Sequence, residues 1–391
     1  MLPVRTLKPK PPSGPVLLVI GTRPDTIKLI PLYRALRKRK IPTLLCSTGQ
    51  HAEIQDNLLT LFQVQPDFDF HIMKENQDLF HSTIAILEQS KELFLKIKPS
   101  IVVVQGDTTS AMSAALAAFY LKIPVAHVEA GLRTKNIRRP FPEELNRRII
   151  ALIASVHFAP TIRAVAHLLA EGIPQKHIFC TGNTVVDALY FIQDEIAKRR
   201  IMPTPAVIDM IQKLRTKNKT ILLLTAHRRE SFDGGLDRVF FAIQTALKRD
   251  PNLHVIFPQH PNPAIQKILQ KTKLHRMPNI QIIAPLPYQD LVYVLGFADC
   301  VATDSGGIQE EAVSLNKPVL ILRKETDRPE GIEEGGACLV GTDPDQILSA
   351  IAQMAKKQPQ TSRPCASLYG DGQASQKIAQ IIHKILKKRS L

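Results

Sequence analysis

The chain alternates short, fully apolar runs with longer stretches in which apolar residues recur every three or four positions. Continuous runs of Val, Ile and Leu are typical of parallel strands that are buried on both faces, and the wider spacing predicts helices. In the first half, the runs that predict strands are 16–20, 42–48, 101–105, 124–130, 156–160 and 177–182. This alternation predicts a parallel α/β sheet.

The pattern changes after residue 182 and then restarts. Residues 183–219 are helical and charged and contain Pro203 and Pro205, so we interpret them as a linker region between two domains. Further strands are predicted at 220–226, 254–259, 280–286, 299–303 and 318–323. Two βα arrays in succession predict two doubly wound, Rossmann-like domains that bind ligands at the carboxyl ends of their strands, in a cleft between them. We assign 15–182 to the first domain and 183–373 to the second.

Composition narrows the class of protein. With 391 residues, 44% of them apolar, the chain can bury two cores, and no apolar run approaches the ~20 residues that cross a bilayer. Residues 1–14 are basic and proline-rich without the apolar centre of a signal peptide, so we expect a flexible tail. Five scattered cysteines without metal-type spacing suit a reducing cytoplasm and predict no metal site.

The net charge of +16 raises the question of a nucleic-acid partner. The cations are spread along the chain, tryptophan is absent and aromatic residues make up only 5%, so a base-stacking surface is not expected. The basic amphipathic segment 377–391 is expected to pack on the body of the protein rather than on a membrane. An anionic small molecule is therefore the predicted partner.

Polar motifs follow six of the predicted strands. They are Gly21-Thr22-Arg23-Pro24 with Lys28 a turn later, Gly106-Asp107-Thr108-Thr109, Glu129 with Arg133, His227-Arg228-Arg229-Glu230, His260, and Asp304-Ser305-Gly306-Gly307. Since ligands of such sheets bind at the carboxyl ends of the strands, we expect these groups to converge on one cleft.

The segment 303–315, TDSGGIQEEAVSL, reads as the end of a strand, a turn and a helix. The free N–H groups and dipole of a helix start bind phosphate well. Gly306 and Gly307 would let a ligand approach the backbone, and Ser305 adds a hydroxyl. The alternative is an ordinary helix start with Ser305 as its N-cap.

Other candidates also have structural alternatives. Asp107 could cap the alanine-rich helix, and Arg23 and Lys28 could be surface cations. Glu143 follows a proline, where acids favour a helix start. Glu129 is different, because a carboxylate that ends an apolar strand is expected to be buried and to need a partner.

Two enzyme classes suit this arrangement. One acts on a nucleotide sugar, with cations and helix starts holding the diphosphate while carboxylates and His227 move protons. The other is a dinucleotide oxidoreductase, which needs G-x-G-x-x-G after the first strand. Here the first strand is followed by GTRPDT, with a single glycine, and no P-loop is present. Oxidoreductase and ATPase functions are therefore disfavoured.

Long motifs in a fixed order carry a family resemblance. They are GTRPDTIKLIPL, TGQH, QGDTTSAMSAALAAFYLKIPVAHVEAGLRT, PFPEELNRR, TGNTVVDAL, TAHRRES, TDSGGIQEEA, KPVLILRKETDRPE and YGDGQAS. From about residue 17 to residue 380, the chain resembles bacterial non-hydrolysing UDP-N-acetylglucosamine 2-epimerases. The resemblance implies a glycosyltransferase-B-like fold, a cytoplasmic homodimer without a redox cofactor, and a last helix, 374–391, that returns to the first domain.

The resemblance also implies an activity, the interconversion of UDP-N-acetylglucosamine and UDP-N-acetylmannosamine for cell-surface polysaccharide. The family route eliminates UDP to give a 2-acetamidoglucal and then adds UDP back with inversion at C2. Positions that match the family's UDP-binding residues are Arg23, Lys28, Ser305, Gly306, Gly307, Glu311 and Arg328. Positions that match its catalytic candidates are Asp107, Glu129, Glu143 and His227. Which carboxylate is the base in each direction stays open.

The chain departs from the family pattern at two places. Gln105 stands where many members have His, and Gln50-His51-Ala52 replaces Gln-His-Arg. The latter region joins a second, activating site in some members, so activation by substrate through Gln50 is a hypothesis. The alternatives to the main function are a hydrolysing 2-epimerase, a 2-epimerase of a diacetamido or uronate UDP-sugar, and a non-catalytic binding protein.

Overall fold

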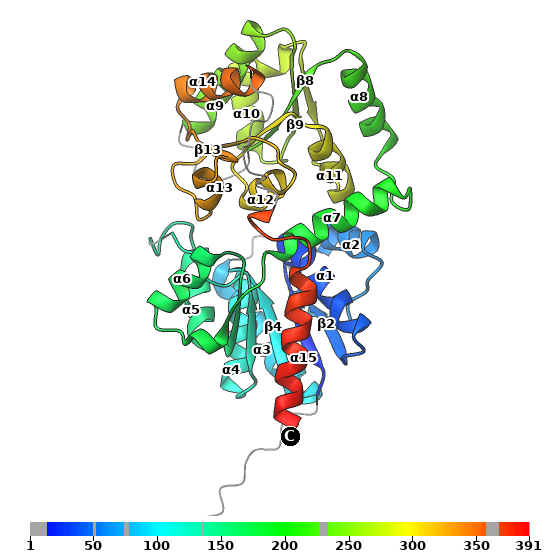
Figure 1. The fold of residues 1–391 in the computed structure, drawn as a ribbon, viewed down its shortest axis with the longest axis vertical. Coiled ribbons are helices and arrows are strands. Elements are labelled where there is room, and N and C mark those ends of the chain that lie inside the picture. The colour runs from blue at the N-terminus through cyan, green and yellow to red at the C-terminus, as the bar shows by residue number, and fades with distance from the viewer. Residues whose placement is uncertain are drawn as a thin grey trace, which may run out of the picture. The chain divides into compact units, whose positions relative to one another are not determined.

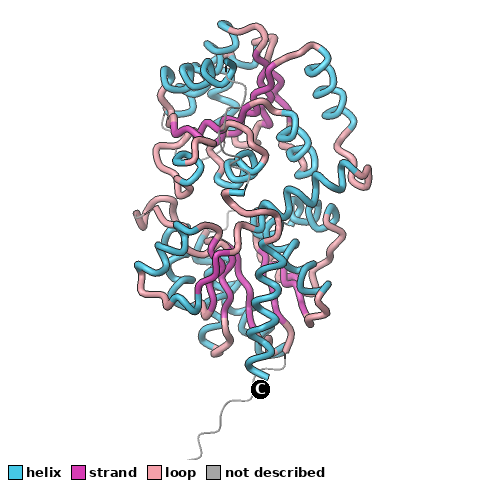
Figure 2. The backbone as a smooth tube through the Cα atoms, in the orientation of Figure 1, coloured by secondary structure: helices cyan, strands magenta, loops and turns pink. Residues whose placement is uncertain are grey.

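The computed structural model of the chain describes residues 14–49, 52–73, 78–134, 136–226, 234–356 and 367–390. The chain forms two compact units, each with one parallel sheet covered by helices (Figure 1, Figure 2). Unit 1 comprises Met1–Gly131, Lys135–Thr181 and Gln373–Leu391, and unit 2 comprises Leu132–Thr134 and Gly182–Gly372. The predicted class, α/β with two Rossmann-like sheets, is confirmed.

The sheet of unit 1 has seven parallel strands in the order β3-β2-β1-β4-β5-β6-β7. The strands are β1 Val16–Ile20, β2 Thr43–Ser47, β3 Phe68–Asp69, β4 Ile101–Gln105, β5 Val125–Val128, β6 Val156–Ala159 and β7 Ile178–Cys180. All but β3 coincide with predicted runs, and β3 has only two residues, too few to show a pattern. The strand order reverses between β1 and β4, which pair in parallel, and ligands bind at such a reversal in doubly wound sheets.

Seven α-helices belong to the described part of unit 1. They are α1 Arg23–Lys38, α2 Ala52–Leu61, α3 Leu79–Ile97, α4 Thr109–Tyr120, α5 Glu143–Ile153, α6 Ile162–Ala170 and α15 Ala374–Ser390, with the short 3-10 helix η1 Gln175–His177. The alanines of α4 are small enough to bring this helix close to the sheet and to α3. They pack with Val102, Val104 and Phe94 in one apolar core.

The C-terminal helix α15 lies alongside α1 in unit 1 (Figure 1). Its apolar residues Ile378 and Ile382, one turn apart, are fully buried. Among the helices that the structure describes, α15 included, none is long and apolar enough to cross a membrane.

The sheet of unit 2 has six parallel strands in the order β10-β9-β8-β11-β12-β13. They are β8 Thr220–Thr225, β9 Leu253–Pro258, β10 Ile280–Ile283, β11 Cys300–Thr303, β12 Val319–Ile321 and β13 Ala337–Leu339. The pattern predicted all but β13, in which only Ala337 is buried. The strand order reverses between β8 and β11, so this pair marks the expected ligand edge of unit 2.

The segment interpreted as a linker forms two helices of unit 2, α7 Thr184–Ala197 and α8 Pro205–Thr216. Both pack on α11 Tyr288–Phe297, and the connection between them is tied down by Asp290, which accepts hydrogen bonds from Thr204 N–H and Oγ1–H at 2.7 and 2.6 Å. The linker interpretation is therefore corrected, because these helices bury apolar faces within the unit. The remaining helices described in unit 2 are α9 Gly235–Arg249, α10 Pro263–Thr272, η3 Leu274–Arg276, α12 Gly306–Ser314, α13 Glu330–Glu333 and α14 Pro344–Lys356.

Candidate functional site

The candidate site in unit 1 lies at the carboxyl ends of β1, β4 and β5. Helix α1 begins at Arg23, which is partly buried, with Thr22 and Asp25 forming a capping box at its start. One turn later Lys28 is 6% exposed and makes an ion pair with Glu129. Lys28 is therefore not a surface cation, and the expectation that Glu129 is buried with a partner is confirmed.

Glu129 directly follows β5 in an uncommon backbone conformation. Its φ is +64°, in the left-handed region that non-glycine residues rarely adopt. Such a conformation costs on the order of 1–3 kcal/mol and persists only where the surroundings impose it, often at functional sites. Here the ion pair with Lys28 and the buried end of β5 hold the carboxylate at the edge of the sheet.

Asp107 lies in the turn after β4 and is held by α5. Its carboxylate makes an ion pair with Arg147, and its backbone carbonyl accepts a hydrogen bond from Asn146 Nδ2 at 2.9 Å. The N-cap of α4 is Thr108, whose side chain accepts from Ala111 N–H at 3.1 Å. The alternative in which Asp107 caps this helix is therefore wrong, and its carboxylate is directed to a cation instead.

The two acids at the start of α5 differ in their surroundings. Glu143 is the first residue of the helix and is partly exposed. Glu144 is fully buried and lies 3.5 Å from Arg147 Nη1 and 3.0 Å from Arg148 Nε. Glu144 therefore binds the same guanidinium, that of Arg147, which pairs with Asp107. The sequence alone did not distinguish this role of Glu144 from the role of its neighbour Glu143.

The sequence interpretation missed Asp25 as a site residue. Its side chain is 2% exposed and accepts hydrogen bonds from Gly21 N–H at 3.2 Å and Thr22 N–H at 3.1 Å. Burial raises the pKa of the Asp25 carboxyl to about 7, although these hydrogen bonds and one from Thr108 oppose the rise. The capping-box spacing from Thr22 to Asp25 was the available signal, but it does not reveal burial.

The candidate site in unit 2 lies where β11 leads into α12. The hydroxyls of Thr225 and Thr303 hydrogen-bond at 2.6 Å across β8 and β11. Ser305 is the N-cap residue of α12, but its side chain makes no capping hydrogen bond. The alternative with Ser305 as the N-cap residue thus holds for its position, but its hydroxyl does not cap the helix by a hydrogen bond. A helix start that begins Gly306-Gly307 is suited to an anion.

Arg328 lies over the first turn of α12. It is 6% exposed and donates from Nε to Glu310 Oε1 at 2.6 Å and from Nη1 to Asp327 Oδ1 at 2.7 Å. A Cβ added at Gly306 would stand 2.4 Å from Arg328 Nη1, whereas one at Gly307 would meet nothing within 4 Å. The glycine at 306 is thus required for the guanidinium to reach the helix start.

Glu311 is 3% exposed on α12. Its Oε1 accepts a hydrogen bond from Tyr288 Oη at 2.7 Å, which orients the carboxylate. Tyr288 begins α11, and its contact with Glu311 could not be foreseen from its position in the sequence.

Three further positions were predicted from the sequence. Gln50 and His227 lie outside the described residues, and His260 is exposed after β9 in unit 2. The expected convergence of all six motifs on one cleft stays a prediction. Within the ranges that the structure describes, no group of three His, Cys, Asp or Glu side chains could hold a metal ion.

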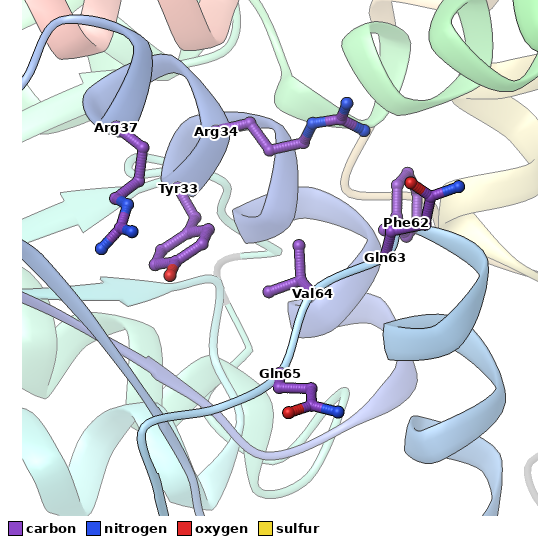
Figure 3. Close-up of a pocket in the computed structure, with 7 residues that line it drawn as sticks. All are labelled: Tyr33, Arg34, Arg37, Phe62, Gln63, Val64 and Gln65. Atoms are coloured by element: carbon purple, nitrogen blue, oxygen red, sulfur yellow. The ribbon is translucent and has the colours of Figure 1, made fainter.

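A pocket of about 390 Å³ in unit 1 lies away from the strand ends described above. It is lined by Tyr33, Arg34 and Arg37 of α1 and by residues 62–65 after α2 (Figure 3). Arg37 donates to the carbonyl of Thr43 at 3.5 Å, and Thr43 begins β2. The pocket is therefore near the amino end of the sheet, opposite the edge where such folds bind substrate.

Both units thus present charged and polar side chains at the reversal of a doubly wound sheet, which defines a glycosyltransferase-B-like α/β enzyme. The family model described as UDP-N-acetylglucosamine 2-epimerase matches residues 34–383. The chain is 41% identical over 373 residues to the UDP-N-acetylglucosamine 2-epimerase of Campylobacter jejuni, covering 94% of this chain and 97% of that one. It is 42% identical to that of Yersinia pestis, covering 94% and 98%.

A solved structure shows the same similarity. The crystal structure of UDP-GlcNAc 2-epimerase from Neisseria meningitidis bound to UDP-GlcNAc matches with a TM-score of 0.86 and 38% identity, covering 94% of this chain and 99% of that one. The chain belongs to the UDP-N-acetylglucosamine 2-epimerase family, and the protein is an epimerase.

Proposed function

We propose that the protein reversibly converts UDP-N-acetylglucosamine to UDP-N-acetylmannosamine without net hydrolysis, in the cytoplasm, as a supply for cell-surface polysaccharide. The observation that carries the proposal is the pair of carboxylates at the strand ends of unit 1, the buried Glu129 and the partly exposed Asp107, each of which is ion-paired. The helix start of α12 with Arg328 supports the binding of UDP in unit 2. The Neisseria meningitidis relative, whose structure holds UDP-GlcNAc, supports the choice of substrate.

The proposed reaction needs a base and a stabilised leaving group. A carboxylate takes the weakly acidic C2 proton, the C1–O bond to UDP breaks, and a C1=C2 double bond forms. UDP leaves with the bonding pair, and its charge is stabilised by Arg23, Lys28, Arg328, His227 and the start of α12. Re-addition of UDP at C1 with protonation of C2 on the opposite face gives the epimer. The elimination and re-addition together are redox-neutral, so the reaction requires no redox cofactor.

Within this proposal, unit 2 binds the leaving group. Ser305, Gly306 and Gly307 bind the diphosphate, and Glu311, oriented by Tyr288, binds the ribose. Asp107, Glu129 and Glu143 of unit 1 supply the proton chemistry.

Isotope exchange tests the proposed function. The protein is incubated with UDP-N-acetylglucosamine in deuterated water, and the products are followed by NMR. We expect deuterium at C2 of a UDP-linked N-acetylmannosamine, because C2 is deprotonated and reprotonated from solvent. Free N-acetylmannosamine with UDP would instead identify a hydrolysing enzyme. An unchanged substrate would contradict the proposal and direct attention to diacetamido or uronate UDP-sugars.

We also propose that the protein forms a homodimer through α3. This helix exposes Phe80, Ile84 and Leu95 by 77%, 55% and 52%, and their spacing places them on one side of the helix. Large exposed apolar side chains on one side of a surface helix are typical of an interface.

Replacing both Phe80 and Ile84 by Asp is therefore expected to convert the dimer to a monomer, as measured by light scattering after gel filtration. Lys96→Asp adds an acid to the same helix about 100° away from the stripe and is the matched control. A dimer that survives the double substitution, or a native protein that is monomeric, would exclude this interface.

A further inference from the structure

Asp25 joins the two turns at the strand reversal of unit 1. Besides the N–H groups of Gly21 and Thr22 in the turn after β1, the Thr108 hydroxyl donates to its Oδ2 at 3.2 Å. The Gln105 amide nitrogen donates to its Oδ1 at 3.0 Å, in the orientation that satisfies both atoms of that amide. These four donors, from the turn after β1, the last residue of β4 and the turn after β4, surround a carboxyl that is 2% exposed.

The surroundings of Asp25 are built for its ionised form. Both carboxylate oxygens accept, and the Gln105 amide oxygen in turn accepts from Gly106 N–H at 3.2 Å. A proton on Asp25 would need an acceptor, so Gln105 would have to turn its oxygen towards Asp25. Its NH₂ group would then face the Gly106 N–H, and two donors facing each other in a buried site are unfavourable.

Gly106 connects the Gln105 amide to the backbone of Asp107. Its carbonyl accepts from His127 Nε2 at 2.7 Å, its φ is +65°, and the next residue is Asp107. The other contact of Asp25 across this turn, Thr108, is the N-cap of α4 and follows Asp107. Movement of Gln105 against Gly106 would therefore shift the backbone that carries Asp107.

We propose that Asp25 is a positioning residue for the epimerisation, whose ionised carboxylate holds the Asp107 turn in place through Gln105 and Thr108. The proposal rests on the proposed function. Asp25 acts through these neighbours, while the proton at C2 is moved by the carboxylates described above.

The carboxyl group of Asp25 is expected to change its protonation state near neutral pH. Burial raises the pKa of Asp25 to about 7, against hydrogen bonds from Gly21, Thr22 and Thr108 that lower it. The charged and titratable groups on the neighbouring elements include Lys28 on α1 with Glu129 after β5, Asp107 with Arg147 of α5, and His127 on β5. Helix α15, which also packs on α1, buries apolar residues, and the described side chains of α2, 57–61, carry no charge. As pH falls through about 7, Asp25 takes a proton and the positioning is lost.

The pH profile of kcat/KM tests this. The native protein should lose about tenfold in rate between pH 8 and pH 6, as one carboxylate titrates with a pKa near 7. Asp25→Asn should lack this acid limb and be about 10- to 100-fold slower at pH 8.5, with unchanged UDP affinity. Gln105→Met removes one donor to the carboxylate, so its acid limb should move to higher pH. An unshifted limb in both variants overturns the proposal. If Asp25→Asn does not fold, an unshifted acid limb in Gln105→Met is by itself enough to overturn the proposal.

A second readout does not depend on turnover. In protein labelled with ¹³C at the aspartate carboxyl carbons, the Asp25 signal should titrate near pH 7, and the Asp107 signal should show an inflection at the same pH. Gln105→Met should remove the inflection from Asp107. A protein without 2-epimerase activity would refute the proposed function yet still give this titration. The positioning role is overturned if the Asp25 signal titrates near the ordinary aspartate pKa of 3.8, or if the Asp107 signal shows no inflection where Asp25 titrates.

Discussion

Replacing Asp107 by asparagine is expected to lower kcat for 2-epimerisation by about 10²- to 10⁴-fold, the usual contribution of a general acid or base. The carboxylate follows the end of β4 and is oriented by Arg147, while Asn146 of α5 donates to the backbone carbonyl of the same residue. Asparagine has the same shape but is a far weaker base. Affinity for UDP should be unchanged, because Asp107 is not among the groups proposed to bind the nucleotide. Deuterium incorporation at C2 and calorimetric titration with UDP measure the two effects.

The control makes the same chemical change at the surface. Asp194→Asn removes a carboxylate whose partner, Lys198, is the C-cap residue of the same helix and about half exposed, so little change is expected in either measurement. Arg147 keeps Glu144 as a partner in Asp107→Asn, which should preserve the fold. An Asp107→Asn protein that retains turnover within threefold of the native rate would exclude Asp107 from the proton chemistry.

Replacing Gly306 by alanine is expected to weaken UDP binding by about 10- to 100-fold. The new Cβ would stand 2.4 Å from Arg328 Nη1, and Glu310 and Asp327 hold that guanidinium in place. Displacing Arg328 removes a charge-assisted hydrogen bond to phosphate, worth roughly 1.5–3 kcal/mol. The crowding itself should destabilise unit 2 by about 1–3 kcal/mol. Calorimetric titration with UDP and the unfolding midpoint test the two parts.

The neighbouring glycine provides the matched control for stability. A Cβ at Gly307 meets nothing within 4 Å, and alanine is the better helix former, so Gly307→Ala should leave the unfolding midpoint unchanged or raise it slightly. If Gly306→Ala binds UDP with native affinity, Arg328 is not part of the nucleotide site. If the two variants are equally destabilised, the steric argument fails.

The strands could be predicted from sequence because burial on both faces leaves a local signature. VLLVI and IVVVQ are continuous apolar runs, and both became fully buried central strands. By contrast, β13 is half exposed and β3 is only two residues long, so neither carried that signature. The helical segment 183–219 was recognised as helical, but its packing on α11 depends on apolar faces that become visible only in the folded unit.

The sequence by itself determined the α/β class, the strand-end position of each motif and the need of Glu129 for a partner, because each follows from local pattern or elementary electrostatics. Tertiary structure alone decided the pairings. Lys28 and Glu129 are 101 residues apart, and Asp25 and Thr108 are 83 apart. Contacts over such separations depend on strand order, which no local pattern encodes. For the same reason the buried roles of Asp25, Glu144 and Tyr288 emerged only when the sheets brought their partners together.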